Sequence, residues 1–114
     1  MLAVYGTLRK GNSNHRLIDG ELKWEGRING FVMHNLGGFP TCVEGNSSIY
    51  VEVYDVTDES ARQIEYLEGY PDFFDRLTVD TPAGKAQMYS CPLDKCGNAD
   101  IINTGDWNDA RRNW

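Results

Sequence analysis

Two short stretches of the sequence combine residue types that could take part in chemistry. The first is Tyr5-Gly6-Thr7-Leu8, which follows the apolar run Leu2 to Val4. A glycine directly after a buried strand lets the backbone approach a ligand closely, and successive free N–H groups can bind a carboxylate or an oxyanion. These four residues are also typical of a plain strand-to-loop turn, so the stretch by itself leaves both interpretations open.

The second stretch is Leu67-Glu68-Gly69-Tyr70-Pro71, at the predicted end of a helix. The helix dipole disfavours a carboxylate in the last turn, and burial in an apolar pocket would raise the pKa of Glu68 further. A carboxyl group that titrates near neutrality suits a residue that transfers protons. The alternative is an exposed acid at a frayed helix end. Glu65, one turn earlier, is predicted to be the solvated carboxylate of the two.

Other catalytic groupings are absent from the sequence. The two histidines, His15 and His34, do not stand at a metal-binding spacing. There is no Gly-x-Ser-x-Gly elbow for a nucleophilic serine. The segment from Gly6 to Gly11 lacks the Gly-Lys-Ser/Thr ending of a phosphate-binding loop. We therefore expect neither a metal nor a cofactor.

Three cysteines, an odd and sparse set, argue against the disulfide framework of a small secreted domain. Cys91 and Cys96 are near enough in sequence to pair or to share a metal. A closed zinc site needs four nitrogen or sulfur ligands, however, and no matching His or Cys pair is present. Together with Cys42, the three are predicted to be reduced thiols of a cytoplasmic protein.

The bulk composition sets further limits. The 114 residues are 40% hydrophobic and 25% charged, which predicts one globular domain spanning 1–114. A formal net charge of −6 disfavours nucleic acid or an anionic membrane as a partner. We expect no signal peptide and no membrane-spanning segment. A small molecule remains as the expected partner, and the oligomeric state is not predicted.

Apolar patterning predicts six or seven strands. In Ile49–Val56 the odd-numbered residues face a core and the even-numbered ones, among them Glu52, lie on the other face. Asn29-Gly30 is a strong two-residue hairpin signal and predicts a turn between two strands. Pro82-Ala83-Gly84 predicts a second hairpin turn. The predicted extended segments are Leu2–Tyr5, Glu21–Ile28, Phe31–Leu36, Thr41–Glu44, Ile49–Val56, Arg76–Asp80 and Lys85–Cys91.

Two helices are predicted. The clear one starts after Thr57, has Ala61, Ile64 and Leu67 at helical spacing, and ends at Gly69. A brief one follows Asn12-Ser13-Asn14 and ends before Gly20. Because helices do not alternate with strands, the fold class is α+β: a small mixed β-barrel, curled or closed, with one clear and one short helix packed outside.

The order of these motifs resembles the γ-glutamylcyclotransferase-like family, and more closely its γ-glutamylamine cyclotransferase and AIG2-like branch. The resemblance extends over nearly the whole chain. The matching motifs are Val4 to Gly11, Asn14 to Leu17, Phe39-Pro40, Glu52 to Val56, Leu67 to Pro71, Arg76, Met88-Tyr89 and Gly105-Asp106-Trp107.

The resemblance implies a small mixed β-barrel with a pocket at one end and an intramolecular reaction. The α-amino group of a γ-glutamyl unit attacks its own side-chain carbonyl, which gives 5-oxoproline and releases the attached amine. Glu68 matches the acid–base glutamate of the family, and Tyr5, Gly6, Thr7 and Leu8 match its substrate-binding loop. The implied substrate is a γ-glutamyl amine or a γ-glutamyl-lysine isopeptide.

The sequence also departs from the family pattern. Val51 stands where many relatives have glycine, and Phe74 where a tyrosine is common. These departures motivate an alternative function, a non-catalytic module that binds or sequesters a small ligand on the same fold. Arg9 and Lys10, beside the glycine loop, are predicted to face solvent.

Overall fold

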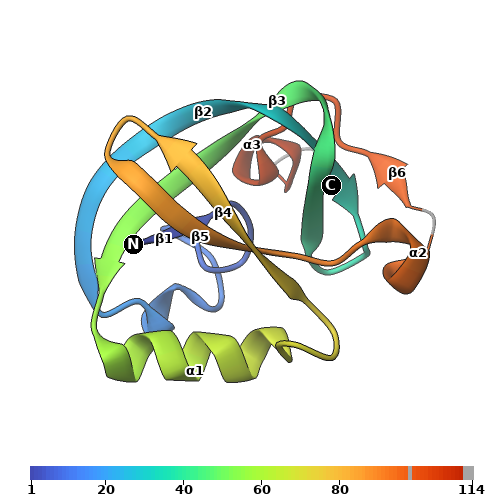
Figure 1. The fold of residues 1–114 in the computed structure, drawn as a ribbon. Helices are drawn as coiled ribbons and strands as arrows, with labels where there is room; N and C mark the ends of the chain where they lie inside the picture. Colours follow the sequence, from blue (N-terminus) through green and yellow to red (C-terminus); the bar gives the residue numbers. More distant parts are fainter. Residues whose placement is uncertain (98, 112–114) are drawn as a thin grey trace.

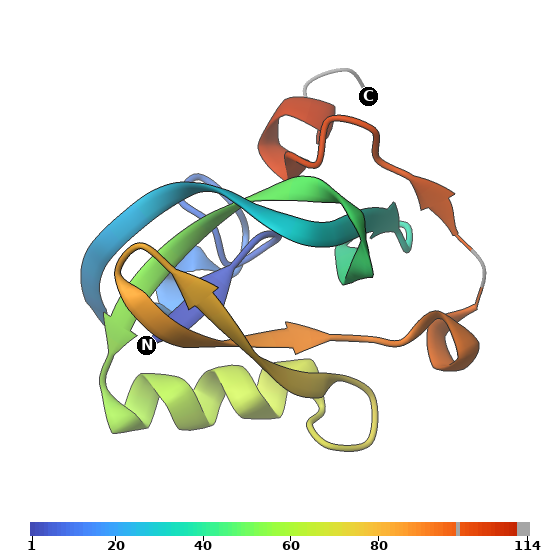
Figure 2. The same cartoon turned by 45° about the horizontal axis from the view of Figure 1, so that its top comes forward.

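A computed structural model describes residues 1–97 and 99–111. In these ranges, six strands form one mixed sheet in the order β4-β5-β1-β3-β2-β6. The sheet curls into a half-barrel, with α1 along one end and α3 with β6 toward the other (Figures 1 and 2). The strands are β1 (Leu2–Val4), β2 (Gly20–Asn35), β3 (Pro40–Val56), β4 (Asp75–Thr81), β5 (Gly84–Ser90) and β6 (Asp100–Ile101). The helices are η1 (His15–Leu17), α1 (Asp58–Glu68), α2 (Leu93–Cys96) and α3 (Trp107–Arg111).

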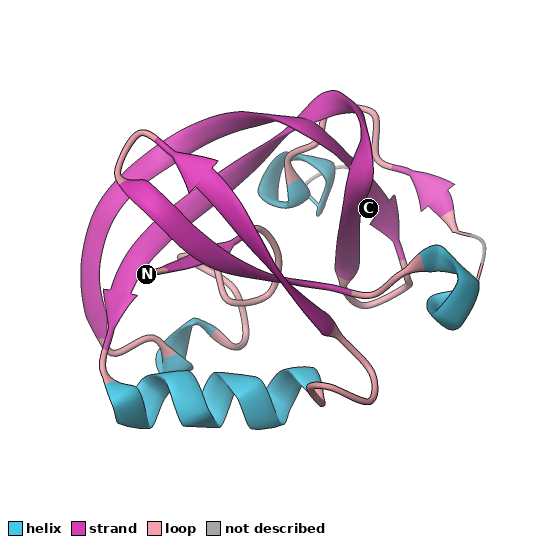
Figure 3. Ribbon diagram, in the orientation of Figure 1, coloured by secondary structure: helices cyan, strands magenta, loops and turns pink. Residues whose placement is uncertain are grey.

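The predicted α+β fold class with a small, curled mixed barrel is confirmed, and the structure shows that the sheet forms a half-barrel (Figure 3). The predicted short helix appears as the 3₁₀ helix η1, and the predicted clear helix as α1. The β4–β5 hairpin around Pro82-Ala83 is also confirmed. None of the described helices is long and apolar enough to cross a membrane.

The predicted hairpin at Asn29-Gly30 is wrong. β2 runs through this point without turning and stays paired with β3, from Gly20 opposite Val56 to Asn35 opposite Pro40. A register shift between Asn29 and Phe31 accommodates Gly30, whose φ is +94°. The turn lies further on, where the Leu36 N–H donates to the Phe39 carbonyl oxygen at 2.9 Å. The two predicted segments of β3 likewise form one strand, because both continue the same antiparallel pairing.

The first strand lies in the middle of the sheet. β1 pairs antiparallel with β3 on one side and parallel with β5 on the other. Its residues alternate between two apolar clusters: Ala3 packs in the first and Leu2 and Val4 in the second. The loop that follows β1 therefore leaves the sheet between two neighbouring strands.

Helix α1 covers the second cluster through Ile64, which is fully buried. The predicted apolar face is only partly correct, because Ala61 and Leu67 are exposed and Ser60 is buried instead. The Ser60 hydroxyl donates to the Leu17 carbonyl oxygen and accepts the Asp19 N–H, which explains how a polar residue is buried there.

Both predicted ends of α1 are confirmed. The Thr57 side chain accepts the Ser60 N–H at 3.2 Å, and Gly69 ends the helix in the left-handed region at φ +65°. Glu68 is thereby the last helical residue.

The predicted reduced state of two cysteines is wrong. Cys91 and Cys96 form a disulfide, with their Cα atoms 6.1 Å apart. The short helix α2 provides the approach, because it folds the chain back so that the Cys96 N–H donates to the Pro92 carbonyl oxygen at 3.0 Å. Cys42 is a free, buried thiol.

Candidate active site

A cavity of about 310 Å³ opens where β1, β5, the end of α1 and the β2–β3 turn meet. All five residues singled out in the sequence line it: Tyr5, Gly6, Thr7, Leu8 and Glu68. The other lining residues are Ala3, Val4, Ser13, Asn14, Gly38, Phe39, Pro40, Leu67, Phe73, Phe74 and Tyr89. The fold thus brings together two stretches that are far apart in the chain.

The Tyr5 side chain forms part of the cavity wall. Its hydroxyl donates to the Tyr89 carbonyl oxygen at 2.7 Å, within the buried region. Burial raises the pKa of Tyr5 well above its ordinary value, so the phenol stays protonated. This hydrogen bond ties the end of β1 to β5, and both residues line the cavity.

The loop after Tyr5 is held by its carbonyl groups. The Gly6 oxygen accepts the Arg9 N–H at 3.0 Å and the Asn12 side-chain amide at 2.9 Å. The oxygen of Thr7 accepts the Asn14 N–H at 3.0 Å, and that of Leu8 contacts the His15 ring nitrogen at 2.9 Å. In the described part of the chain, the N–H groups of Gly6, Thr7 and Leu8 donate to no protein acceptor. The loop is therefore held at three carbonyl groups and keeps three backbone donors without a protein acceptor in the described residues.

Glu68 is partly buried rather than fully exposed at a frayed helix end. Burial raises its pKa from 4.5 to about 7. Among the described residues lining the cavity, none carries a lysine, arginine or histidine side chain that would favour the charged form. A carboxyl group in this state can accept a proton and return it near neutral pH.

The neighbouring acid Glu65 lies in a different environment. Its side chain is 43% exposed and forms an ion pair with Arg76 at 3.6 Å. Arg76 in turn lies 4.4 Å from the ring centre of Tyr70, which contacts the Tyr89 ring edge-on. The contrast within one helix turn distinguishes Glu68 as the carboxyl group that faces the cavity.

The prediction that Arg9 faces solvent is wrong, whereas Lys10 is exposed as predicted. Arg9 is only 5% exposed. Its Nε donates to Glu52 Oε2 at 2.9 Å and its Nη1 to Asp106 Oδ1 at 2.7 Å. The guanidinium carbon also lies 4.6 Å from the ring centre of Tyr50. The cation is buried because two carboxylates and an aromatic ring surround it.

Glu52, on β3, is the second residue of this buried network whose burial the sequence did not indicate. It is only 2% exposed, although strand alternation placed it on the face away from the core. Burial by itself raises the pKa of Glu52, but hydrogen bonds from the Lys10 N–H, the Tyr54 hydroxyl and Arg9 outweigh burial and lower it. Glu52 is therefore an anchored anion that holds the backbone beyond the glycine loop.

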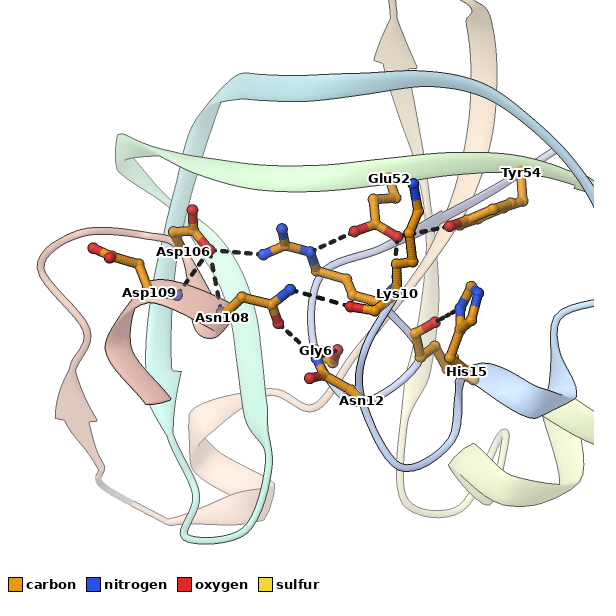
Figure 4. Close-up of polar contacts among 11 residues, drawn as sticks. Gly6, Lys10, Asn12, His15, Glu52, Tyr54, Asp106, Asn108 and Asp109 are labelled. Atoms are coloured by element: carbon orange, nitrogen blue, oxygen red, sulfur yellow. Dashed lines mark hydrogen bonds and ion pairs between the residues drawn. The ribbon is translucent and has the colours of Figure 1, made fainter. Parts of the chain in front are cut away.

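The C-terminal segment completes this buried network (Figure 4). Asp106 Oδ1 accepts the Asn108 N–H at 3.1 Å and the Asp109 N–H at 3.3 Å in addition to Arg9. The Asn108 side chain accepts the Asn12 amide at 2.6 Å and approaches the Lys10 carbonyl oxygen at 3.4 Å. In the sequence, this network was indicated only by Glu52, which stands between Tyr50 and Tyr54, and by the Gly105-Asp106-Trp107 motif.

The two departures from the family pattern are both buried, but only one of them lines the cavity. Val51 is fully buried in the first apolar cluster, away from the cavity lining. Phe74 is 4% exposed and does line the cavity.

Across residues 1–97 and 99–111, no group of three or more His, Cys, Asp or Glu side chains is arranged to hold a metal ion.

Comparison with known proteins gives a consistent result. The family described as "Gamma-glutamyl cyclotransferase, AIG2-like" matches residues 2–109. A protein of Vibrio cholerae is 33% identical over 112 residues, which cover 94% of each chain. The Escherichia coli K12 protein named "Gamma-glutamylcyclotransferase family protein YtfP" is 30% identical over 109 residues, covering 93% of this chain and 94% of its own.

Solved structures show the same likeness. The crystal structure of an uncharacterized protein from Pyrococcus horikoshii superimposes with a TM-score of 0.83 at 29% identity, covering 98% of this chain and 92% of the other. The solution structure of the Escherichia coli protein ytfP gives 0.74 at 30% identity, covering 96% and 97%. Fold, motif order and relatives agree, and the chain belongs to the gamma-glutamyl cyclotransferase, AIG2-like family.

Proposed function

We propose that this protein is a cyclotransferase that converts a γ-glutamyl amine, or a γ-glutamyl-lysine isopeptide, into 5-oxoproline and the free amine. The observation that carries the proposal is Glu68, a carboxyl group whose pKa is raised to about 7 in the same cavity as the glycine loop. Its small-molecule substrate fits a chain whose net charge of −6 disfavours nucleic acid and anionic membranes.

The reaction begins with proton removal. The Glu68 carboxylate takes a proton from the α-ammonium group of the substrate, and the freed amine attacks the γ-carbonyl carbon. A C–N bond forms and the carbonyl π electrons move to oxygen. The nucleophile belongs to the substrate, and holding the substrate curled makes the attack intramolecular. For this reason the proposed reaction needs no cofactor and no nucleophilic side chain.

The glycine loop supports the charged parts of the substrate. The unpaired N–H groups of Gly6, Thr7 and Leu8 are suited to the oxyanion or to the α-carboxylate, which has no cationic side chain to bind in the described cavity lining. Protonated Glu68 then gives its proton to the leaving nitrogen as the original amide C–N bond breaks. The oxyanion electrons re-form the carbonyl as that bond breaks. The ring nitrogen then gives its second proton to the Glu68 carboxylate, which passes it to the departing amine. The products are 5-oxoproline and the amine as an ammonium ion, and Glu68 is a carboxylate again.

Release of 5-oxoproline from a panel of γ-glutamyl amines, including γ-glutamyl-lysine, tests the proposal. We expect release by the wild type and its loss in Glu68→Gln. The matched control is Glu65→Gln, one turn earlier on the same helix and outside the cavity, which should retain activity. Full activity of Glu68→Gln would refute the role of Glu68. Binding of the panel without release would instead support the alternative function, a non-catalytic ligand-binding module.

A further inference from the structure

Three phenylalanine rings contact one another at the cavity. Phe39 comes from the β2–β3 turn, and Phe73 and Phe74 from the connection between α1 and β4. The ring centres are 6.3 Å apart for Phe39–Phe73, 6.3 Å for Phe39–Phe74 and 5.1 Å for Phe73–Phe74. We refer to these three residues as the aromatic cluster. It joins the two loops that flank one side of the cavity.

The aromatic cluster extends from the interior to the surface. Phe74 is 4% exposed, whereas Phe73 is 45% exposed and Leu67, another lining residue, is 42% exposed. Large apolar side chains exposed together beside a cavity are typical of a surface that a ligand covers. A ligand seated in the cavity would remove this apolar area from water.

The aromatic cluster also adjoins the proposed acid. The Phe73 N–H donates to the carbonyl oxygen of Gly69, the residue after Glu68, at 2.8 Å. This turn fixes Phe73 next to the end of α1. A group attached to the nitrogen that Glu68 protonates therefore leaves the reacting centre close to Phe73.

The charges around the cavity limit which substituents the leaving nitrogen can carry. The described cavity lining has no cationic side chain, and its one carboxyl group is Glu68, which the proposed reaction occupies. A carboxylate on the leaving group has no partner here, and an ammonium tail loses hydration without a dedicated counter-charge. An uncharged alkyl or aryl group gains from burial against the rings.

We propose that the aromatic cluster is the subsite for the leaving amine, and that it selects amines with an uncharged apolar alkyl or aryl substituent. This inference rests on the proposed cyclotransferase function and narrows its substrates to γ-glutamyl amines with such a substituent, in preference to the γ-glutamyl-lysine isopeptide, whose leaving amine is charged. The glutamyl part binds at the glycine loop and Glu68, and the substituent of the amine lies against Phe39, Phe73 and Phe74.

A pair of substrates of matched length tests the inference. γ-Glutamyl-pentylamide ends in a methyl group, and its 5-aminopentyl counterpart adds a terminal ammonium. We expect the kcat/KM for 5-oxoproline release to be at least about tenfold higher for the pentylamide, because several methylenes are buried without desolvating a charge. Equal values, or a preference for the ammonium, would overturn the inference without touching the cyclotransferase proposal.

Substitution at Phe73 assigns the preference to the aromatic cluster. Phe73→Asp places a carboxylate at the exposed ring position and should reverse the preference toward the ammonium substrate. Tyr66→Ala is the matched control, because Tyr66 is 90% exposed and outside the cavity, and it should leave the ratio unchanged. A ratio in Phe73→Asp equal to that of the wild type rejects the subsite. The wild-type ratio stands as a test even if this variant does not fold.

Calorimetric binding of the same two compounds to Glu68→Gln separates the two proposals. Tighter binding of the pentylamide without wild-type turnover of either compound would retain the subsite and reject the cyclotransferase function. Equal binding would reject the subsite.

Discussion

Glu52 and Glu68 are both carboxyl groups withdrawn from water, yet their pKa values shift in opposite directions. Glu52 accepts hydrogen bonds from a guanidinium, a phenol and a backbone N–H, and its pKa is lowered. Glu68 faces a cavity whose described lining offers no cation, and burial raises its pKa to about 7. Burial acts on both groups in the same direction, so the donors around them decide the outcome.

The comparison separates a structural anion from a proton carrier. The network of Arg9, Glu52 and Asp106 holds the glycine loop, and the lowered pKa of Glu52 suits this role because it favours the ionised carboxylate. Proton transfer needs a group that changes state near neutral pH, and Glu68 meets this requirement. The two regions meet in one loop, because Arg9 follows Leu8 directly.

The largest expected effect comes from removing the titrating group of the cavity. Glu68→Gln should lower kcat for 5-oxoproline release by about 10²–10⁴-fold, the usual contribution of a general acid–base residue. The fold should persist, because a neutral amide resembles the protonated carboxyl group. Release rates and thermal melting measured together check both statements. A decrease in kcat of less than tenfold would contradict the assignment of Glu68 as the acid–base residue.

Removing the cation that Glu52 and Asp106 share should lower the free energy of unfolding. Arg9→Met leaves Glu52 and Asp106 without their shared cation, and we expect a loss of about 3–5 kcal/mol in the free energy of unfolding. Urea denaturation measures it. Lys10→Met removes the same charge from the exposed neighbouring residue and should change stability by less than about 0.5 kcal/mol. Equal losses in the two variants would mean that the buried network contributes nothing specific.

The pH dependence of activity should follow Glu68. As the proposed base, it must be ionised in the free enzyme, so kcat/KM should fall about tenfold per pH unit below about 7. A profile that stays flat from roughly two pH units below that pKa up to it would show that another group removes the proton.

Stability should show the opposite dependence for the two carboxyl groups. The raised pKa of Glu68 means that the folded state binds its proton more tightly. The resulting stabilisation is complete below pH 4.5 and is lost as the pH rises toward about 7. The lowered pKa of Glu52 stabilises the folded state at pH values above the ordinary pKa of a glutamate, and this stabilisation is lost as the pH falls through the lowered pKa. Urea titrations at several pH values measure both effects. In Glu68→Gln the loss of stability toward pH 7 should disappear, and the loss in acid that comes from Glu52 should remain.

The smallest expected effect concerns the link to the C-terminal segment. Asn108→Ala removes the side-chain contacts to Asn12 and Lys10 and should cost about 1 kcal/mol. Amide exchange at Arg9 and Asn14, whose N–H groups bind the Gly6 and Thr7 carbonyl oxygens, should become faster. Unchanged exchange there would show that the loop is held without Asn108.

Local sequence was sufficient where local physics dominates. The caps of α1 are encoded by Thr57 and Gly69, and they place Glu68 at the helix end. The β4–β5 hairpin follows from its own turn residues, and two local motifs contain five of the residues that line the cavity, Tyr5 to Leu8 and Glu68. In each case the deciding interaction lies within a few residues of the signal.

The tertiary structure decided whatever depends on a distant partner. Asn29-Gly30 carries a hairpin signal, but continuous pairing of β2 with β3 converts it into a bulge. Arg9 looks like a surface charge until Glu52 and Asp106, brought from β3 and the C-terminal segment, make its burial favourable. The direction of each glutamate's pKa shift was likewise decided by folding, because donors from other elements surround Glu52 and the described cavity lining offers Glu68 no cation. The sequence alone indicated Tyr5 to Leu8 and Glu68 as candidate site residues, and only the packing of distant elements brought them to one cavity, supplied the rest of its lining and set the charge state of each glutamate.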